Sequence, residues 1–245
     1  QGILVFSGHP IIAAGESTPK LISQWYRKTH QQICCVGNGV TEDFLHNDSL
    51  DDTDPYQKLR PSKIVVVVAP KTYGFPTNDM SVSMTIDIAK KLENSPQKIN
   101  FIVIGRNKDD KEEELPSKIY FTGFLPSRND FITHIKYADI SLLPFSKQAV
   151  AGGARNKALD YFASQKLVIS TPEGLRGLSE FRHLQHLLVT SYSTEDIAQT
   201  ILDVALNQAK YQPLAQAAYS LIKEKYSWGA RAQSIANILL TTSNS

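Results

Sequence analysis

The sequence predicts an α/β protein with a doubly wound, mostly parallel sheet, preceded by a short βαβ remnant of a second domain. The first observation is an unbroken apolar run, IVVVV at residues 64–68, which is typical of a strand covered on both faces. The second is the alternation of strand-like and helix-like segments from about residue 60 onward. Such an alternation is the order of a parallel sheet whose strands are joined by crossover helices.

The individual elements follow from apolar runs separated by polar or glycine-containing turns. Strands are expected at residues 64–68, 101–104, 119–122, 140–143, 167–170 and 187–190. Helices are expected at residues 80–92, 129–137, from 156 onward, from 193 or 194 to 206, 213–225 and about 230–240. The helix that ends at residue 206 has a clear start, because Ser193 or Thr194 can cap it and two acids follow.

The first 46 residues are interpreted as a remnant of an N-terminal domain. A strand at residues 3–6, a helix at 18–28 and a strand at 33–36 make one βαβ unit, which is too small to be a domain alone. The polar, aspartate-rich residues 47–62 are expected to form an exposed linker. Residues 63–228 would then form the sheet domain, and residues 229–245 a C-terminal helix and tail.

The composition is that of a globular protein without a strong electrostatic field. The chain has 42% hydrophobic and 20% charged residues, and 26 basic against 24 acidic residues give a formal charge of +2. Charge therefore does not predict nucleic acid as a partner. No apolar run approaches the ~20 residues that span a bilayer, and a signal peptide is not expected. The adjacent Cys34 and Cys35 would point to opposite faces of a strand, so no disulfide and a cytoplasmic location are expected.

The stretch GGARNKALDYFASQKLVIST, residues 152–171, holds the main candidate site. Its candidate ligand-binding residues are Gly152, Gly153, Ala154, Arg155, Asn156 and Lys157. They stand at the start of a helix that follows a strand, where ligands of open parallel sheets bind and where unpaired backbone N–H groups carry partial positive charge. Glycines allow close backbone approach and the two cations add charge, so the segment suits a phosphate or pyrophosphate.

Asp160 lies one turn inside the same helix. Because Asn156 and Lys157 precede it by four and three residues, the three side chains share one helical face. A carboxylate there can accept hydrogen bonds from ribose or sugar hydroxyls while a phosphate occupies the helix tip. The structural alternative is a surface ion pair between Lys157 and Asp160, worth ~0–1 kcal/mol, beside an ordinary glycine turn.

The longer run ADISLLPFSKQAVAGGARNKALDYFASQKLVISTPEGLRGL, residues 138–178, resembles the nucleotide-sugar-binding, Rossmann-like half of GT-B glycosyltransferases, most closely the retaining family 4. The matching positions are Tyr137, Ala138, Asp139, Pro144, Lys157, Asp160, Tyr161, Ala163 and Thr171. VGNGVTEDF resembles the family's interdomain hinge, NFIVIG and IYFTGFLP resemble two of its strands, and YSWGARAQSIANIL resembles its closing helix. These pieces span about residues 36–240 in the family's order.

This resemblance implies transfer of a sugar from a nucleoside-diphosphate sugar to a glycan, lipid-linked or other acceptor, with retention and without a metal. A UDP- or GDP-sugar would be the donor, and no further cofactor is implied. By matching position, Asp160 would bind the ribose hydroxyls and Lys157 the diphosphate, which makes these two the catalytic candidates. The 152–155 backbone would cradle the distal phosphate and the sugar, and Gly123 and Phe124 would meet the nucleobase. Pre-placed cations and N–H groups stabilise charge on a leaving diphosphate.

Three departures from the family pattern bear on activity. The family's paired glutamates are replaced by Gly152 and the shorter Asp160. Its usual Arg and Lys after the first strand of this domain are not in register in APKTYGFPTND, which leaves Lys71 as the candidate. Most of the N-terminal domain is missing, so donor binding is expected of this chain and transfer is not. Any peripheral membrane contact would run through that missing part.

Two other positions carry weaker signals of a binding site. Gly105 and Arg106 follow the strand at 101–104 and so lie where a phosphate could be reached, although a plain surface arginine is the alternative. The run from Asp52 to Asp54 spells the D-x-D of metal-binding glycosyltransferases of another fold. Here it lies in a polar linker and does not end a strand, so no metal site is expected.

Two other classes of function remain as alternatives. A degenerate, non-catalytic GT-B domain that serves as a binding or scaffolding module is favoured by Gly152 and by the short N-terminal part. A nicotinamide-binding domain is disfavoured, because APKTYG stands where a G-x-G-x-x-G would follow the first strand.

Overall fold

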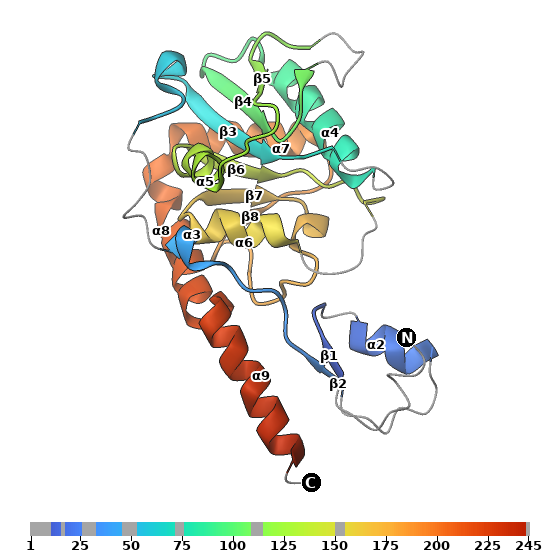
Figure 1. Cartoon of the computed structure of the whole chain (residues 1–245). Coiled ribbons are helices and arrows are strands. Elements are labelled where there is room, and N and C mark those ends of the chain that lie inside the picture. Colours follow the sequence, from blue (N-terminus) through green and yellow to red (C-terminus); the bar gives the residue numbers. More distant parts are fainter. Residues whose placement is uncertain are drawn as a thin grey trace.

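A six-stranded parallel sheet forms the body of the molecule (Figure 1). The computed structural model describes residues 11–15, 18–25, 33–45, 53–71, 76–108, 115–149 and 155–243. The strands are β3 Lys63–Val68, β4 Ile99–Ile104, β5 Ile119–Phe121, β6 Ile140–Leu143, β7 Leu167–Ser170 and β8 Leu188–Val189. Their order is β5-β4-β3-β6-β7-β8, so the direction of winding reverses between β3 and β6. The predicted doubly wound parallel sheet is confirmed.

The register brings the carboxyl ends of the strands to one edge. β3 and β4 pair over their full length, from Lys63 opposite Ile99 to Val68 opposite Ile104. β6 and β7 likewise end together, with Leu143 opposite Ser170. The loops that follow these strands therefore meet at one edge of the sheet, which is where the candidate residues were expected.

The helices cover both faces of the sheet. They are α4 Thr77–Leu92, α5 Arg128–Lys136, α6 Asn156–Ala163, α7 Thr194–Leu206 and α8 Gln208–Leu221. Ile64 and Val66 of β3 pack with α5 and α6, whereas Val65 and Val67 pack with α4 and α7. Because side chains alternate between the faces of a strand, burial on both faces accounts for the unbroken apolar run.

The starts of two helices can be compared with those expected from the sequence. Ser193 caps α7, because its hydroxyl accepts hydrogen bonds from the backbone N–H groups of Glu195 and Asp196. The expected start of the next helix at Pro213 was wrong, because α8 begins at Gln208 and contains the proline. Proline removes one donor of the helical ladder, and here that single loss is accommodated in the second turn.

The described N-terminal residues form a βαβ unit, which lies apart from the main sheet in Figure 1. It consists of β1 Ile11–Ala13, α2 Thr18–Trp25 and β2 Ile33–Cys35, and its two strands are parallel. The strand expected at residues 3–6 lies outside the described residues, and β1 was not expected. Its three residues are too short a run to show the alternation that marks a strand. Cys34 and Cys35 of β2 are not joined to each other by a disulfide.

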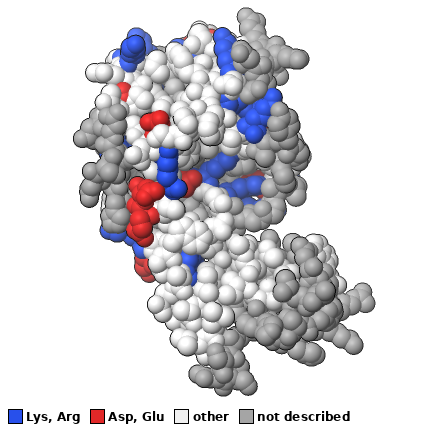
Figure 2. Space-filling model, viewed as in Figure 1, with Lys and Arg blue, Asp and Glu red and all other residues white. Residues whose placement is uncertain are grey.

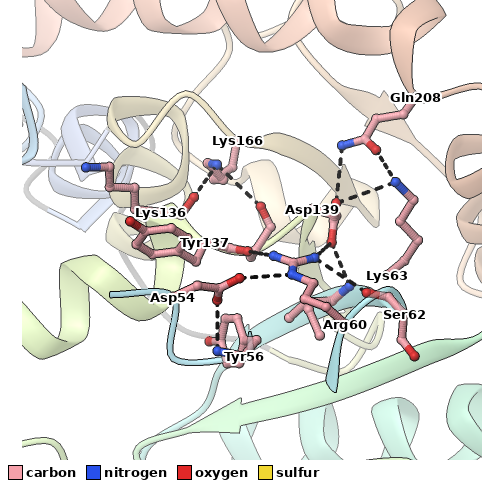
Figure 3. A network of polar contacts seen from close by, with 12 residues as sticks. Asp54, Tyr56, Arg60, Ser62, Lys63, Lys136, Tyr137, Asp139, Lys166 and Gln208 are labelled. Atoms are coloured by element: carbon pink, nitrogen blue, oxygen red, sulfur yellow. Dashed lines mark hydrogen bonds and ion pairs between the residues drawn. The ribbon is translucent and has the colours of Figure 1, made fainter. Parts of the chain in front are cut away.

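The segment between the two parts packs more tightly than an exposed linker would. After α3 Glu42–Leu45, the described part from residue 53 includes a short turn of 3₁₀ helix, η1 Gln57–Leu59. Tyr56 is 3% exposed, and its hydroxyl donates to a backbone carbonyl of α5 at 2.9 Å. The Arg60 guanidinium joins Asp54 at 3.0 Å to Asp139, just before β6, at 2.7 Å (Figure 3). Ion pairs across this short stretch thus fix it to the sheet domain.

The C-terminal segment crosses the hinge segment, residues 36–44, which follows the N-terminal unit. A π-helical turn, η4 Ile222–Tyr226, leads into α9 Trp228–Ser243, which extends away from the sheet in Figure 1. At the crossing, the Val40 N–H donates to the Tyr226 carbonyl at 2.7 Å, and the Trp228 N–H donates to the Val40 carbonyl at 3.3 Å. Among the described residues, no helix is both long and apolar enough to cross a membrane.

Candidate functional site

The candidate site lies at the carboxyl edge of the sheet, where the strand order reverses between β3 and β6. α6 begins there after Arg155, and none of the described side chains caps its start. Its first backbone N–H groups therefore retain hydrogen-bonding capacity and partial positive charge. The helix is fixed against β3, because the Val68 N–H donates to the buried Tyr161 hydroxyl at 2.7 Å.

Lys157 in the first turn of α6 holds an ammonium group close to other cations. Its Nζ donates to Oδ1 of Asn78 on α4 at 2.5 Å and lies 5.3 Å from the centre of the Phe145 ring. Burial, followed by the nearby Arg155 and Arg106, lowers the pKa of Lys157 to about 7. An ammonium in such a place gains strongly from an anionic ligand.

Arg106 is a buried cation at the end of β4, with only 3% of its surface exposed. Its Nη1 forms an ion pair with Asp79 of α4 at 2.5 Å, and its Nε donates to the Ala69 carbonyl at 3.3 Å. Its Nη2 is buried and finds no hydrogen-bond partner in the described part of the chain. The plain surface arginine that the sequence left open is therefore excluded.

A hollow of about 230 Å³ lies at the start of α6. It is lined by Thr77, Asn78, Phe145, Arg155, Asn156 and Lys157. On the face shown in Figure 2, Lys and Arg side chains are recessed in the hollowed middle of the molecule. The lining contains two cations and no carboxylate, so it suits an anionic group.

Arg155 differs from a simple surface cation. Its Nη2 contacts the Glu173 carboxylate at 2.6 Å and the Ala149 carbonyl at 2.7 Å, and its Nε donates to the Glu173 carbonyl at 3.3 Å. The guanidinium also lies 4.5 Å from the centre of the Phe145 ring. Arg155 thus uses most of its side-chain donors to hold the loops after β6 and β7 together.

Asp160 lies one helical turn beyond Lys157 and is half-buried. Burial raises the pKa of Asp160 to about 7, and the positive charge of Arg128 opposes this shift. Within the part of the chain that the structure describes, its carboxylate has no hydrogen bond or ion pair. The surface ion pair with Lys157 that the sequence allowed is absent there. A partly desolvated carboxylate without a partner is suited to accept hydrogen bonds from a ligand.

Gly105 and Gly123 sit in two loops that are joined by backbone hydrogen bonds. The Gly105 N–H donates to the Gly123 carbonyl at 3.1 Å, and the Gly123 N–H donates to the Arg106 carbonyl at 2.9 Å. Both glycines have positive φ, at 91° and 69°. Phe124 follows directly and is 82% exposed. An aromatic ring in this position is open to stacking.

The remaining predicted residues are less informative. Lys71 follows β3 and is exposed. Gly152, Gly153 and Ala154 lie outside the described residues. Asn156 accepts a hydrogen bond from the Asn38 side chain at 2.7 Å, which links the start of α6 to the hinge after β2.

A larger hollow elsewhere does not match the expected chemistry. It has a volume of about 630 Å³ and lies beside β8, where its lining includes His183, Asp196, Asp203 and Tyr211. Its two carboxylates would repel a diphosphate. Size alone therefore does not select the site.

Comparison with protein families decides the assignment of this arrangement. The family described as "Glycosyl transferases group 1" matches residues 64–207, which is more than half of the chain. The chain belongs to this family. By sequence, no curated protein matches this family member at a significant level.

Solved structures share the fold of this glycosyl transferases group 1 protein at low sequence identity. A glycosyltransferase from Rickettsia africae superposes with a TM-score of 0.73 at 14% identity, over 95% of this chain and 63% of its own. HepE from Anabaena, in complex with UDP and glucose, gives 0.72 at 14% identity, over 95% and 63%. WaaG, a glycosyltransferase involved in lipopolysaccharide biosynthesis, gives 0.70 at 15%, over 91% and 60%. The chain thus spans less than two thirds of the length of these structures.

Sequence reasoning missed two residues of the site in this family member. Asn78 binds the Lys157 ammonium from α4, a helix that is far away in the sequence. Glu173 is buried and receives both Arg155 at 2.6 Å and Arg176 at 2.7 Å. The acid directly after Pro172, where a strand ends, was the available signal, but nothing in the sequence pairs it with an arginine before α6.

The D-x-D sequence at residues 52–54 is described by the structure from residue 53 onward. The Asp54 carboxylate pairs with Arg60 and accepts a hydrogen bond from the Tyr56 backbone N–H, on the side of the sheet where β3 and β6 begin. Among the residues that the structure describes, no three His, Cys, Asp or Glu side chains come together as a metal site.

Proposed function

We propose that this chain forms the donor side of a nucleotide-sugar-dependent glycosyltransferase and binds the nucleoside diphosphate of the sugar donor. The observation that carries the proposal is the start of α6, where the half-buried Lys157 ammonium stands one turn from the Asp160 carboxylate, which has no partner among the described residues. Family membership supplies the reaction class. Sugar transfer requires the diphosphate to leave, and this part of the protein has the charge to assist that departure.

The diphosphate is assigned to the hollow at the start of α6. Lys157 and the first backbone N–H groups of α6 would contact its oxygens, and the buried Arg106 adds positive charge from behind. These groups are held before the ligand arrives, so they can stabilise the negative charge that develops on the leaving group with little reorganisation. This electrostatic assistance needs no metal ion.

The nucleoside is assigned to Asp160 and Phe124. The Asp160 carboxylate would accept hydrogen bonds from the ribose hydroxyls, which restore the partners that burial has removed. The exposed Phe124 ring would stack on the nucleobase beside the Gly105–Gly123 loop pair. UDP is the first donor nucleotide to test, because HepE of similar fold was crystallised with UDP and glucose.

Transfer with retention to a glycan or lipid-linked acceptor rests on the family resemblance. The division into an acceptor-side remnant at residues 1–46, a linker at 47–62, a donor domain at 63–228 and a closing helix also belongs to the proposal. A second function, a non-catalytic binding module, is favoured by one observation. Gly152 stands where the family has the first of its two glutamates.

Calorimetric titration of the chain with UDP, GDP, ADP and NAD tests the proposal. We expect one nucleoside diphosphate to bind, and NAD not to bind. Asp160→Ala and Lys157→Met should each weaken binding by roughly tenfold or more, because each removes a charged hydrogen-bonding group. Lys90→Met, on the exposed end of α4, is the matched control.

Two results would contradict the donor-site assignment. One is a folded chain that binds none of the four nucleotides. The other is binding with unchanged affinity in both the Asp160 and the Lys157 variants, because the nucleotide would then lie elsewhere.

A further inference from the structure

A second small pocket lies at the hinge between the N-terminal unit and the sheet domain. Its volume is about 230 Å³, which is below the ~300–1,000 Å³ of sites that enclose a drug-sized ligand. Its walls come from segments that are far apart in sequence: Gly37 and Asn38 after β2, Glu180 after β7, Tyr226 of η4 and Arg231 of α9. The pocket is therefore suited to one small group of a larger ligand.

Arg231 is the unsatisfied group in this pocket. Its guanidinium lies 4.0 Å from the centre of the Tyr226 ring, and its Nε is buried without a hydrogen-bond partner among the residues that the structure describes. In the described ranges of the chain it forms no ion pair. A guanidinium that is stacked on an aromatic ring and has an unpaired Nε–H is pre-organised for a planar anion.

Glu180, which supplies a carboxylate to the described lining of this pocket, does not neutralise Arg231 by direct contact. Glu180 instead pairs with Lys225 at 2.6 Å and accepts a hydrogen bond from the Tyr226 hydroxyl at 2.9 Å. Its negative charge nevertheless remains close by. A singly charged carboxylate on the ligand would be repelled less by Glu180 than a doubly charged phosphate.

The hinge pocket and the donor hollow are neighbours, because a hydrogen bond joins a lining residue of one to a lining residue of the other. Asn38 lines the hinge pocket, and its side-chain amide donates to Asn156, which lines the hollow at the start of α6. A group held at Arg231 would therefore belong to a molecule that reaches the donor site. For a transferase, this molecule is the acceptor.

We infer that the hinge pocket is an acceptor subsite in which Arg231 binds the carboxylate of an acidic sugar. This inference rests on the proposed function, because only a donor at α6 makes the neighbouring ligand an acceptor. The carboxylate would pair with the Arg231 guanidinium, and the Asn38 side-chain carbonyl would accept a hydrogen bond from a sugar hydroxyl. Acidic saccharides are thus the acceptor class that this chain selects.

Glucuronate, with glucose as its uncharged counterpart, is the probe. The side-chain Nε–H resonance of Arg231 in ¹⁵N-labelled protein reports binding at the site itself. We expect glucuronate to shift this resonance in a saturable manner and glucose to leave it unchanged. Arg231→Met should weaken glucuronate binding, followed by backbone resonances, roughly tenfold or more. Arg182→Met, an exposed arginine on a nearby loop, should not.

A second variant covers the case in which Arg231→Met does not fold. In Gly37→Ala the added methyl would lie 3.8 Å from the Arg231 Nη2, so it narrows the pocket without a clash. It should weaken glucuronate binding while the guanidinium stays in place. The absence of any shift at Arg231, or equal affinity in the Arg231 and Gly37 variants and the wild type, would overturn the inference. Inorganic phosphate binding as tightly as glucuronate would also overturn it.

UDP added to the same sample separates this inference from the proposed function. If UDP binds and glucuronate does not, the acceptor subsite is wrong and the donor site stands. If glucuronate shifts Arg231 and UDP does not bind, the assignment as an acceptor subsite is overturned together with the donor proposal.

Discussion

At the scale of single residues, Lys157 and Asp160 are both held in environments that disfavour their charged forms. Burial lowers the pKa of the lysine and raises that of the aspartate, each to about 7. Groups shifted in opposite directions near neutral pH mark sites where a ligand is expected to supply the missing interactions. The stability of the ligand-free protein and its affinity for a diphosphate should therefore both depend on pH.

Asp160→Asn should stabilise the ligand-free protein more at pH 8 than at pH 5. The folded pKa of Asp160, about 7, lies above its ordinary value of 3.8, so the folded state loses stability as pH rises between these values. The side-chain amide of the variant does not ionise, so the variant does not lose this stability as pH rises. A thermal melt at each pH measures the gain, at about 2–4 °C for each kcal/mol recovered. An equal gain at both pH values would show that the carboxylate is not desolvated.

The affinity for UDP should fall as pH rises above 7. The Lys157 ammonium deprotonates with a pKa of about 7 in the free protein, so binding of a diphosphate at higher pH requires proton uptake. Lys157→Arg keeps its charge and should bind UDP with little change between pH 7 and pH 9. Calorimetry in buffers of different ionisation enthalpy counts the protons. No proton uptake by the wild type at pH 8 would contradict the assignment of Lys157.

Some residues of the site could be predicted from sequence and others could not. Lys157 and Asp160 follow from a glycine-rich helix start after a strand and from their three-residue spacing. The pairing of Arg155 with Glu173 could not be predicted, because it joins two loops through tertiary structure. The role of Asn78 depends on how α4 packs against α6, which no local pattern encodes.

At the scale of elements, the position of α6 depends on one buried hydroxyl. Tyr161→Phe would remove the acceptor of the Val68 N–H and leave that donor buried and unpaired, which costs ~1–3 kcal/mol. We expect the melting temperature to fall by about 2–4 °C for each kcal/mol lost. Tyr120→Phe, on a 41% exposed side chain, is the control and should have no effect. Equal melting temperatures of the Tyr161 variant and the wild type would contradict this role.

The long strands were predictable and the short connecting elements were not. β3 has apolar side chains on both of its faces, so its pattern alone indicates a central parallel strand. β1 has three residues, which is too few for a periodic signal. The residues before β3 look like a linker in composition, yet Tyr56 and Arg60 tie them to the sheet domain through contacts with distant segments (Figure 3).

At the scale of the whole molecule, the C-terminal crossing joins the two parts at the hinge. Gly39 packs against Trp228, and a methyl group on Gly39 would lie 2.9 Å from the indole ring. Gly39→Ala should therefore destabilise the protein by ~1–3 kcal/mol through overpacking. The same change at Gly37 has nearest neighbours at 3.8 Å and should be tolerated. Chemical unfolding of both variants measures the difference in their free energies of unfolding. Equal values would show that Gly39 is not tightly packed against Trp228.

The central claim, that a nucleoside diphosphate binds at the start of α6, is tested most directly by a crystal structure of the chain with UDP. We predict diphosphate oxygens within hydrogen-bonding distance of the Lys157 ammonium and ribose hydroxyls at the Asp160 carboxylate. UDP bound in the larger hollow beside β8, with the α6 hollow left empty, would contradict the claim.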